Sequence, residues 1–451
     1  MKISKLILLT SLITSSLFSQ EHFNGISSSK RGGLLNAAHN PAELVNMTTK
    51  YEVTLFNFSL AMANDKLTFD DLIKGDNLED KIFEGNGTVN LRLDAQIHGP
   101  AFALKTEKWG FGISSIANVK ANIVNIDTKL ADAIQNGELS NLFTQTTIAS
   151  NENQRLNATT WGELNFNIAR NLIDLPKHKV NAGTNLRLLF PGGYANFSAD
   201  NLNGTIVNNL GNTSLMNTSA NINIAYAGAL ANNFDDQSNY NEFFSQGING
   251  FAVDLGLNYR WKDENDANSY RINAGLSVKN MGSMTFKSDN NLNKNYNLNV
   301  EGIESLDLNQ FDGVESISEL ETIINNPANA SYFQSTSSTA DFKVKLPTVI
   351  SAYADVRITK KWFVTGSIYQ KVSDDSKNDI TTTQNSYSII PRFTSGWFEA
   401  YAPLSSNEIS GFTSGIGFRL AGFFVGSNSI ISAMASEGKQ ADIYLGVRFG
   451  I

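Results

Sequence analysis

The sequence contains no cysteine, only 4 histidines and 8 prolines, and few charged residues, which make up 17% of the chain. Without cysteine there is no disulfide framework, no thiolate metal site and no lipid-anchored N-terminal cysteine. The histidines, His22, His39, His98 and His178, show neither metal-ligand spacing nor a carboxylate partner at helical distance. We therefore predict no metal site.

Signatures of catalysis and of nucleic-acid binding are also missing. No G-x-S-x-G, Walker or dinucleotide fingerprint is present. His98 belongs to the polar face of its predicted strand, whereas lipid-cleaving barrels need a histidine beside a serine on the outer face. The net charge of −8 argues against nucleic acid as a partner. We predict no enzyme activity, no catalytic residue and no cofactor.

Long apolar runs are confined to the N-terminus. Lys2 and Lys5 precede the apolar residues 6–17, and the small Ser19 follows, which is the layout of a secretory signal peptide. We expect residues 1–19 to be removed by cleavage near Ser19, because a transmembrane anchor would need a longer run with fewer serines and threonines. Since no later segment offers 18 consecutive apolar residues, only strands could cross a membrane.

The remaining chain alternates apolar and polar residues. Residues 251–261 place Phe251, Leu255 and Tyr259 on one face and Asp254 and Arg260 on the other. The same period recurs in residues 89–99, 178–190, 271–280, 411–420 and 441–451. These runs are about 10–13 residues long, which matches strands that cross a bilayer rather than the ~5–6 residues of soluble strands. The prediction is an all-β fold, a transmembrane antiparallel β-barrel of about 14–16 strands over residues 51–451. A soluble β-sandwich, which also alternates, is the alternative.

The connections are uneven in length, as in bacterial outer-membrane barrels with short periplasmic turns and long external loops. Tight turns are predicted near 105–108, 262–268, 359–361 and 395–396, and long polar loops near 64–86, 123–156, 230–248, 281–341 and 372–386. Residues 191–217 form either a membrane-crossing strand pair or a projecting hairpin, and a short helix is expected at 316–326. The tryptophans near strand ends suit an interfacial girdle or ordinary edge packing. They are Trp109, Trp161, Trp261, Trp362 and Trp397.

Charged residues on the polar faces are predicted to point into the lumen. They are Arg92, Asp94, Arg187, Asp254, Arg260, Arg271, Arg419, Asp442 and Arg448. These side chains could fix an internal segment, bind an anionic head group, or pair across neighbouring strands. Outer-membrane barrels usually end on an aromatic residue that the assembly machinery reads. Here the last aromatic residue on the apolar face is Phe449, two residues before the end, and we predict that it serves as this signal.

Residues 34–44, "LLNAAHNPAEL", precede the first strand and resemble the N-terminal Asn-Pro-Ala signature of the FadL/PorV-like superfamily of outer-membrane β-barrels. The match falls on Asn40, Pro41 and Ala42. Shorter stretches that are similar to this superfamily follow in the expected order and cover most of the barrel. They are residues 250–261, 272–283 and 346–362, while the closing 415–431 and 441–450 resemble an uncharacterised branch.

The resemblance implies that residues 20–50 fold inside the barrel as a hatch and that the barrel passes or binds a hydrophobic small molecule in the bacterial outer membrane. A wide barrel must be filled or wetted, so a small-residue plug is physically reasonable. Alternatively, the Asn-Pro-Ala stretch merely starts a short helix with proline first. The implied partners are outer-membrane lipids and the barrel assembly machinery. The alternative function is a non-transporting PorV-like barrel that binds secreted or surface proteins through residues 281–341, as an accessory of type IX secretion.

Overall fold

The structure is a computed structural model that describes residues 22–75, 78–135, 143–209, 211–231, 243–263, 269–287, 290–311, 314, 316–435 and 438–450. The predicted signal peptide and its cleavage site lie outside the described residues. Among the helices described, none is long and apolar enough to span a membrane.

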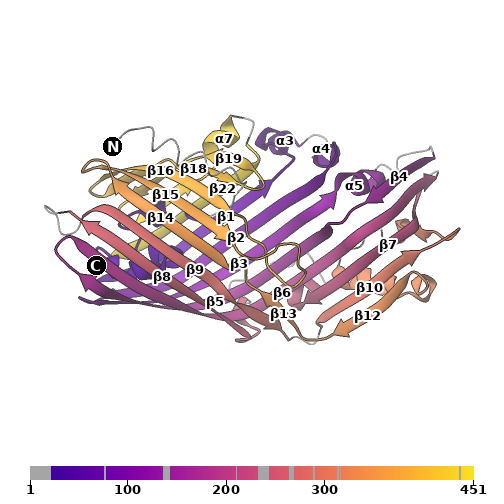
Figure 1. The fold of residues 1–451 in the computed structure, drawn as a ribbon, viewed down its shortest axis with the longest axis horizontal. Helices are drawn as coiled ribbons and strands as arrows, with labels where there is room; N and C mark the ends of the chain where they lie inside the picture. The colour runs from indigo at the N-terminus through magenta and orange to yellow at the C-terminus, as the bar shows by residue number, and fades with distance from the viewer. Residues whose placement is uncertain are drawn as a thin grey trace.

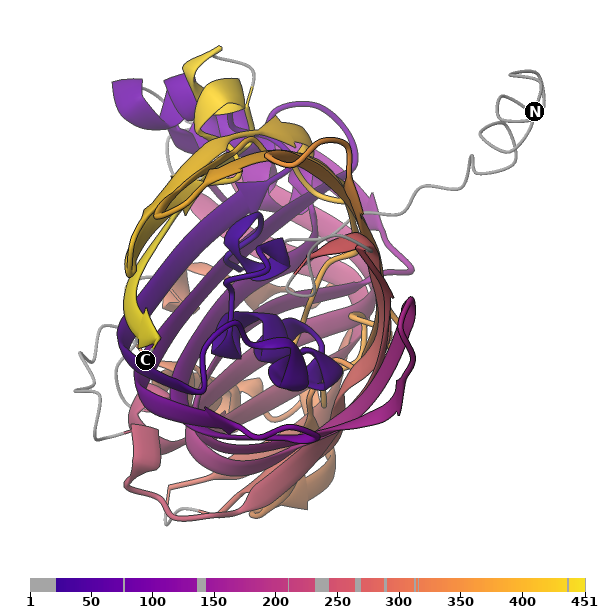
Figure 2. The ribbon, with the colours of Figure 1, turned by 90° about the vertical axis from the view of Figure 1, so that its left-hand side faces the viewer.

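Fourteen antiparallel strands close into a barrel, in which the first strand pairs with the last (Figure 2). This confirms the predicted fold class and an even strand number within the predicted range. Pro403 and Gly415 each divide one strand into two pieces. The strands are β1 (Tyr51–Asn64), β2 (Thr88–Lys105), β3 (Trp109–Asp127), β5 (Asn153–Asp174), β6 (His178–Asn209), β8 (Gly250–Lys262), β9 (Tyr270–Phe286), β14 (Val349–Arg357), β15 (Trp362–Lys371), β16 (Ser386–Ser395), β17 with β18 (Phe398–Tyr401, Leu404–Asn407), β19 with β20 (Gly411–Ser414, Ile416–Leu420), β21 (Phe423–Ser427) and β22 (Gln440–Gly450).

The outer wall of the barrel is apolar. On β8, Phe251 and Leu257 are 65% and 54% exposed, whereas Asp254 and Asn258 on the same strand are buried. A strand alternates its side chains between two faces, so the exposed face is the apolar one and the lumen is polar. An exposed apolar band around a closed barrel is what a lipid bilayer requires of a spanning protein.

Part of the wall continues beyond the barrel rim (Figure 1). The first half of β6 pairs with β8 and its second half with β7. The part of the sheet beyond the rim includes the outer halves of β3, β5 and β6. We call this part the extension. It is completed by β4 (Thr144–Ala149), β7 (Asn212–Ala227), β10 (Leu292–Val300), β11 (Leu306–Asp307) and β12 (Phe333–Thr339), while β13 (Phe342–Lys345) pairs with β9.

The extension settles one open point and corrects another. Residues 191–217 form the projecting hairpin of β6 and β7 rather than a pair of membrane-crossing strands. The region 281–341 is not a long polar loop, because β10 and β12 lie within it and pair with each other. The physical reason is visible in β10, where Tyr296, Leu298 and Val300 are buried on one face while asparagines occupy the other.

Short helices cover the ends and interior of the barrel. Helix α6 agrees with the helix predicted at 316–326 and packs on β6 and β7 of the extension. The helices are η1 (Ile26–Ser28), α2 (Leu34–His39), η2 (Pro41–Asn46), α3 (Phe69–Lys74), α4 (Leu78–Phe83), α5 (Thr128–Gln135), η3 (Gly228–Ala231), η5 (Asn309–Phe311), α6 (Ile317–Ile324), η6 (Pro327–Asn329) and α7 (Ile430–Met434).

The N-terminal segment lies inside the ring of strands, where η1, α2 and η2 are seen through the barrel mouth (Figure 2). Asn40 caps η2 by accepting the backbone N–H of Ala42, and Pro41 occupies its first position. The Asn-Pro-Ala stretch therefore both begins a short helix and lies within the lumen. We keep the name hatch for this segment, described from His22 onward.

Four of the five tryptophans divide between two environments, while Trp261 at the end of β8 is partly exposed. Trp109, Trp362 and Trp397 are exposed at strand ends beside tight turns, as an interfacial girdle requires. Trp161 is instead 3% exposed and donates its indole N–H to Glu163 in the lumen. The girdle expectation was wrong for Trp161, because its position on β5 falls on the inward face of the strand.

Candidate functional site

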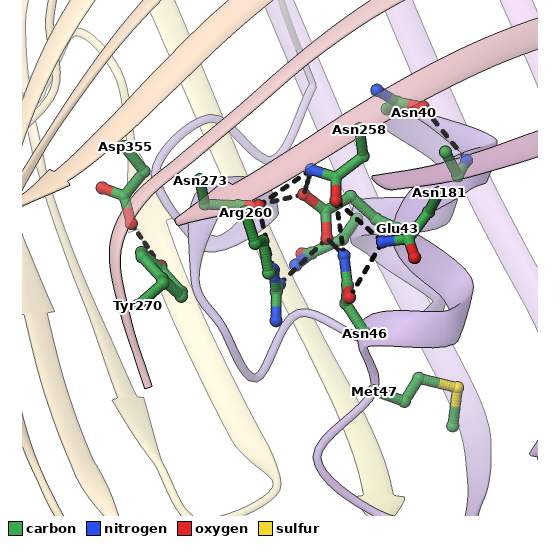
Figure 3. Close-up of polar contacts among 12 residues, drawn as sticks. Asn40, Glu43, Asn46, Met47, Asn181, Asn258, Arg260, Tyr270, Asn273 and Asp355 are labelled. Atoms are coloured by element: carbon green, nitrogen blue, oxygen red, sulfur yellow. Dashed lines mark hydrogen bonds and ion pairs between the residues drawn. The ribbon is translucent and has the colours of Figure 1, made fainter. Parts of the chain in front are cut away.

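Glu43 fixes the hatch to the barrel wall (Figure 3). It lies in η2, is 4% exposed, and forms an ion pair of 3.0 Å with Arg260 of β8. Its carboxylate also accepts the amide N–H groups of Asn258 at 2.9 Å and Asn273 at 2.7 Å, and the hydroxyl of Tyr353. One buried charge thus ties the hatch to three neighbouring strands, β8, β9 and β14.

Asn40 makes a second attachment of the hatch. Its amide donates to the Leu257 carbonyl oxygen at 2.9 Å. Two wall glycines allow this close approach, because a Cβ at Gly183 would lie 2.5 Å from the Ala42 nitrogen and one at Gly256 would lie 2.0 Å from the Asn40 side-chain oxygen. The wall is shaped to the predicted Asn-Pro-Ala residues, since any larger side chain at these glycines would collide with them.

The other predicted charges mostly pair across neighbouring strands. Arg187 contacts Glu163 at 3.1 Å and Asp254 at 2.7 Å, so three strands share one guanidinium. Further pairs are Asp94 with Lys120, Arg419 with Glu399 at 3.1 Å, and Arg448 with Glu52 at 3.0 Å. Pairing of this kind keeps buried charges from being left uncompensated.

Several of these pairs also touch the hatch. Glu52 accepts the backbone N–H of Leu34 at 2.9 Å, and Glu399 accepts the hydroxyl of Ser29 at 2.6 Å. Asp94 lies 3.1 Å from His22. Of the three interpretations left open for the luminal charges, cross-strand pairing and hatch fixation therefore coexist.

Two predicted luminal residues have other contacts, and one is not luminal. Arg92 donates to the carbonyl oxygen of Ile123 at 2.5 Å, and Asp442 accepts the hydroxyl of Ser429. Arg271 is exposed, with its guanidinium 5.7 Å from the ring centroid of Trp261. The inward assignment of Arg271 was wrong because the β8–β9 register shifts beside it, which breaks the alternation.

Phe449 lies on the outer wall, half exposed and opposite Val53 of β1. Its predicted role as the assembly signal stays a prediction.

A loop closes the opposite end of the lumen. Residues 372–385, which we call the lid, fold into the barrel mouth instead of projecting outward. Arg155, fully buried on β5, donates to the carbonyl oxygens of Asp375 at 2.8 Å and Ile380 at 3.1 Å. Tyr194 donates its hydroxyl to the Asn378 carbonyl oxygen at 2.6 Å. The hatch and the lid together plug the barrel from both ends.

A small polar chamber separates the two plugs. It has a volume of about 120 Å³, and its lining combines the hatch residue His22 with the wall residues Lys120, Glu163 and Arg187 and the lid residue Thr383. Most of its charges already have partners in the pairs described above. The chamber suits water or a small polar solute rather than an apolar molecule.

A much larger cavity of about 620 Å³ lies on the other face of the extension, which we call the apolar cavity. Leu156 and Phe197 contribute from the sheet, on the face opposite the inward-pointing Arg155, and Leu298 contributes from β10. Helix α6 covers it with Ile317 and Leu320. Nearly all of the lining is aliphatic or aromatic, so a bound molecule would find almost no hydrogen-bonding partner there.

Sequence reasoning missed Glu43, Glu163, Glu399 and Arg155. The acidic residues could have been found from the predicted inward arginines. Each such arginine needs an acceptor, and few acidic residues lie at inward positions where they could supply one. Within the described part of the chain, no group of three or more acidic or histidine side chains is arranged to hold a metal ion.

The chain is similar in structure to several solved membrane proteins. The deltaS2S3 mutant of the TodX monoaromatic hydrocarbon channel is 10% identical, with a TM-score of 0.43 over 96% of this chain and 95% of that chain. The P. putida toluene transporter TodX is 10% identical, with a TM-score of 0.38 over 91% and 90%. The translocator domain of the autotransporter NalP from Neisseria meningitidis is 8% identical, with a TM-score of 0.32 over 89% of each chain.

Comparison with the curated proteins finds no match. The model of a protein family of unknown function, DUF5723, matches residues 41–428, from the hatch to the end of β21. Because this match spans most of the sequence, the chain belongs to the family of unknown function DUF5723.

Proposed function

We propose that this protein is a bacterial outer-membrane barrel that captures apolar small molecules on its external side and holds them or passes them inward. The apolar cavity carries this proposal. Its volume of about 620 Å³ falls within the ~300–1,000 Å³ of typical small-molecule sites.

The lining of the apolar cavity selects the chemical class of the ligand. Phe197, Leu298 and Leu320 offer only apolar surface, and the few polar residues at its edge are asparagines and one serine. Water in such a space gains few hydrogen bonds, so an apolar molecule that displaces it is favoured by the burial of its own surface.

The position of the cavity supports capture from outside. It lies beside the extension, at the end of the barrel that carries the long loops, and Leu156 at its edge is 47% exposed. In outer-membrane barrels the long-loop end faces the exterior. Inward passage would require the lid and the hatch to move, because both occupy the lumen, whereas binding requires neither.

The test fills the cavity without changing its polarity. Ala199 lines the cavity and is 7% exposed, so Ala199→Phe should occupy part of the volume. The control is Ala354→Phe, because Ala354 is exposed on β14 away from the cavity. Binding of the fluorescent apolar dye N-phenylnaphthylamine would be titrated with each protein in lipid nanodiscs.

We expect saturable dye binding by the wild type and by Ala354→Phe, and binding at least tenfold weaker by Ala199→Phe. Equal binding by all three proteins would place the dye in the lipid or elsewhere and would contradict the proposal. Co-purification of a stoichiometric secreted protein without any apolar ligand would favour the protein-binding alternative.

A further inference from the structure

The extension has a second face, on which polar side chains form regular rows. Side chains of β5, β6, β7, β10 and β12 that point toward the lid alternate with those that line the apolar cavity. Asn153 marks this inner face, because its amide donates to the Ser376 carbonyl oxygen of the lid at 2.6 Å. The strand partners of Asn153 continue the row across the sheet. They are Asp200, Asn221, Asn297 and Gln334.

A neighbouring row is held rigid by its own hydrogen bonds. Asn196 donates to the side-chain oxygen of Asn223 at 2.8 Å, and Asn223 donates to that of Asn295 at 2.9 Å. Asn295 then donates to the hydroxyl of Ser337 at 2.8 Å. These amides are fixed before any ligand arrives, so a ligand that uses this surface need not order it.

Between this face and the lid lies an open groove of about 550 Å³, which we call the asparagine groove. Seven of its fourteen lining residues are asparagines, and only Glu152, Asp200 and Lys377 carry charge. The amides of Asn221 and Asn297 are exposed along its floor. The side chain of Tyr296, whose backbone also lines the groove, belongs to the apolar cluster on the opposite face.

We propose that the asparagine groove binds a neutral carbohydrate chain. Each asparagine amide presents donors and an acceptor side by side, which matches the paired hydroxyl groups of a sugar ring. Strands repeat every ~4.7–4.9 Å across a sheet, a spacing comparable to the length of one sugar ring, so successive rings of an extended chain meet equivalent amides.

The same lining argues against the other ligand classes. Phosphorylated or nucleic-acid ligands need clustered positive charge, and the groove offers only Lys377, opposed by Glu152 and Asp200. A protein partner would need an apolar or aromatic anchor site, which the exposed floor lacks. The inference is independent of the proposed function, because the two sites occupy opposite faces of the same strands.

The test removes the two exposed amides together. The variant combines Asn221→Ala with Asn297→Ala. The control is Asn299→Ala, because Asn299 is an exposed asparagine on the same face of β10 as Asn297 but lies outside the groove. Proteins in nanodiscs would be titrated calorimetrically with maltooligosaccharides, chitooligosaccharides and mannan fragments, and separately with purified lipopolysaccharide from the host membrane. Heat-modifiable migration on gels would show that the variants are folded.

We expect the wild type and Asn299→Ala to bind at least one neutral glycan, and the double variant to bind it roughly tenfold or more weakly, as expected when two or more ligand hydrogen bonds are lost. Binding of the soluble series that the double variant weakens assigns an external glycan. Binding of lipopolysaccharide alone assigns the carbohydrate of the membrane itself only if the double variant weakens it, and otherwise overturns the proposal. No binding to any of these probes, or binding unchanged in the double variant, would overturn the proposal.

Discussion

Replacing Glu43 should release the hatch while leaving the barrel closed. In Glu43→Ala the partly buried guanidinium of Arg260 loses its buried carboxylate partner, and the amides of Asn258 and Asn273 lose an acceptor. Removing one partner of a buried ion pair costs about 3–5 kcal/mol. The barrel wall keeps its ladder hydrogen bonds, so this cost should fall on the attachment of the hatch. A loss of about 3 kcal/mol would raise the population of the detached hatch roughly 100-fold.

The absence of native cysteine makes this measurable. Ala37 lies in α2 of the hatch and is 1% exposed, so Ala37→Cys introduces a single protected thiol. The rate of maleimide labelling of this thiol then reports how often the hatch opens. The matched control is Asp355→Asn. Asp355 forms a buried ion pair of 2.6 Å with Arg392, and both residues belong to wall strands, so this variant breaks a buried pair that does not involve the hatch.

With Ala37→Cys as the parent protein, we expect labelling of the introduced thiol to accelerate roughly 100-fold on adding Glu43→Ala and to stay close to the parent rate on adding Asp355→Asn. Equal labelling rates in the Glu43→Ala protein and its parent would refute the reasoning that Glu43 holds the hatch. Heat-modifiable migration on gels should show a folded barrel in every variant.

Three further predictions concern the two plugs. Gly183→Ala should also speed labelling of the hatch thiol, because its Cβ would lie 2.5 Å from the Ala42 nitrogen, whereas Gly366→Ala, where a Cβ meets open space, should not. Arg155→Met should free the lid, since it removes the donors to Asp375 and Ile380; amide exchange in residues 373–382 should rise markedly, and unchanged exchange would contradict the assigned role. The hydroxyl of Ser376 at 2.7 Å and its backbone N–H hold the pKa of Asp374 in the lid below its ordinary value. This contribution is present at neutral pH and lost as the pH falls below about 4, so lid exchange should rise in acid, and Asp374→Asn should abolish that part of the pH dependence.

The barrel could be predicted from sequence because its signal is repeated. Long alternating runs, such as residues 251–261, fix both the strand and the face that meets lipid, and the exposed fractions on β8 agree with that assignment. The β6–β7 hairpin of the extension was one of two alternatives that the sequence left open. The strands β10 and β12 were not predicted, because the asparagines of β10 resemble those of a loop. Tyr296, Leu298 and Val300 nevertheless alternate with them, and counting the period of two would have identified the strand.

The contacts of the lumen depend on the closed barrel and could be predicted only in part. Alternation placed Arg187 and Arg260 on inward faces, but their partners come from other strands and from the hatch. Register shifts limit such assignments, as Arg271 shows, because one extra residue redirects a side chain. The inward fold of the lid was not predicted, because a polar loop sequence does not distinguish a loop that folds inward from one that projects outward. The lid is held by Arg155, which lies more than 200 residues earlier in the sequence.

The most direct test of the proposed function is native mass spectrometry of the protein extracted gently from its own outer membrane, with Ala199→Phe prepared in parallel. We expect the wild type to retain an apolar small molecule and Ala199→Phe to lose it, because the ligand occupies the apolar cavity. A wild-type spectrum without any small ligand, or one in which Ala199→Phe retains the same mass equally well, would contradict capture at this site.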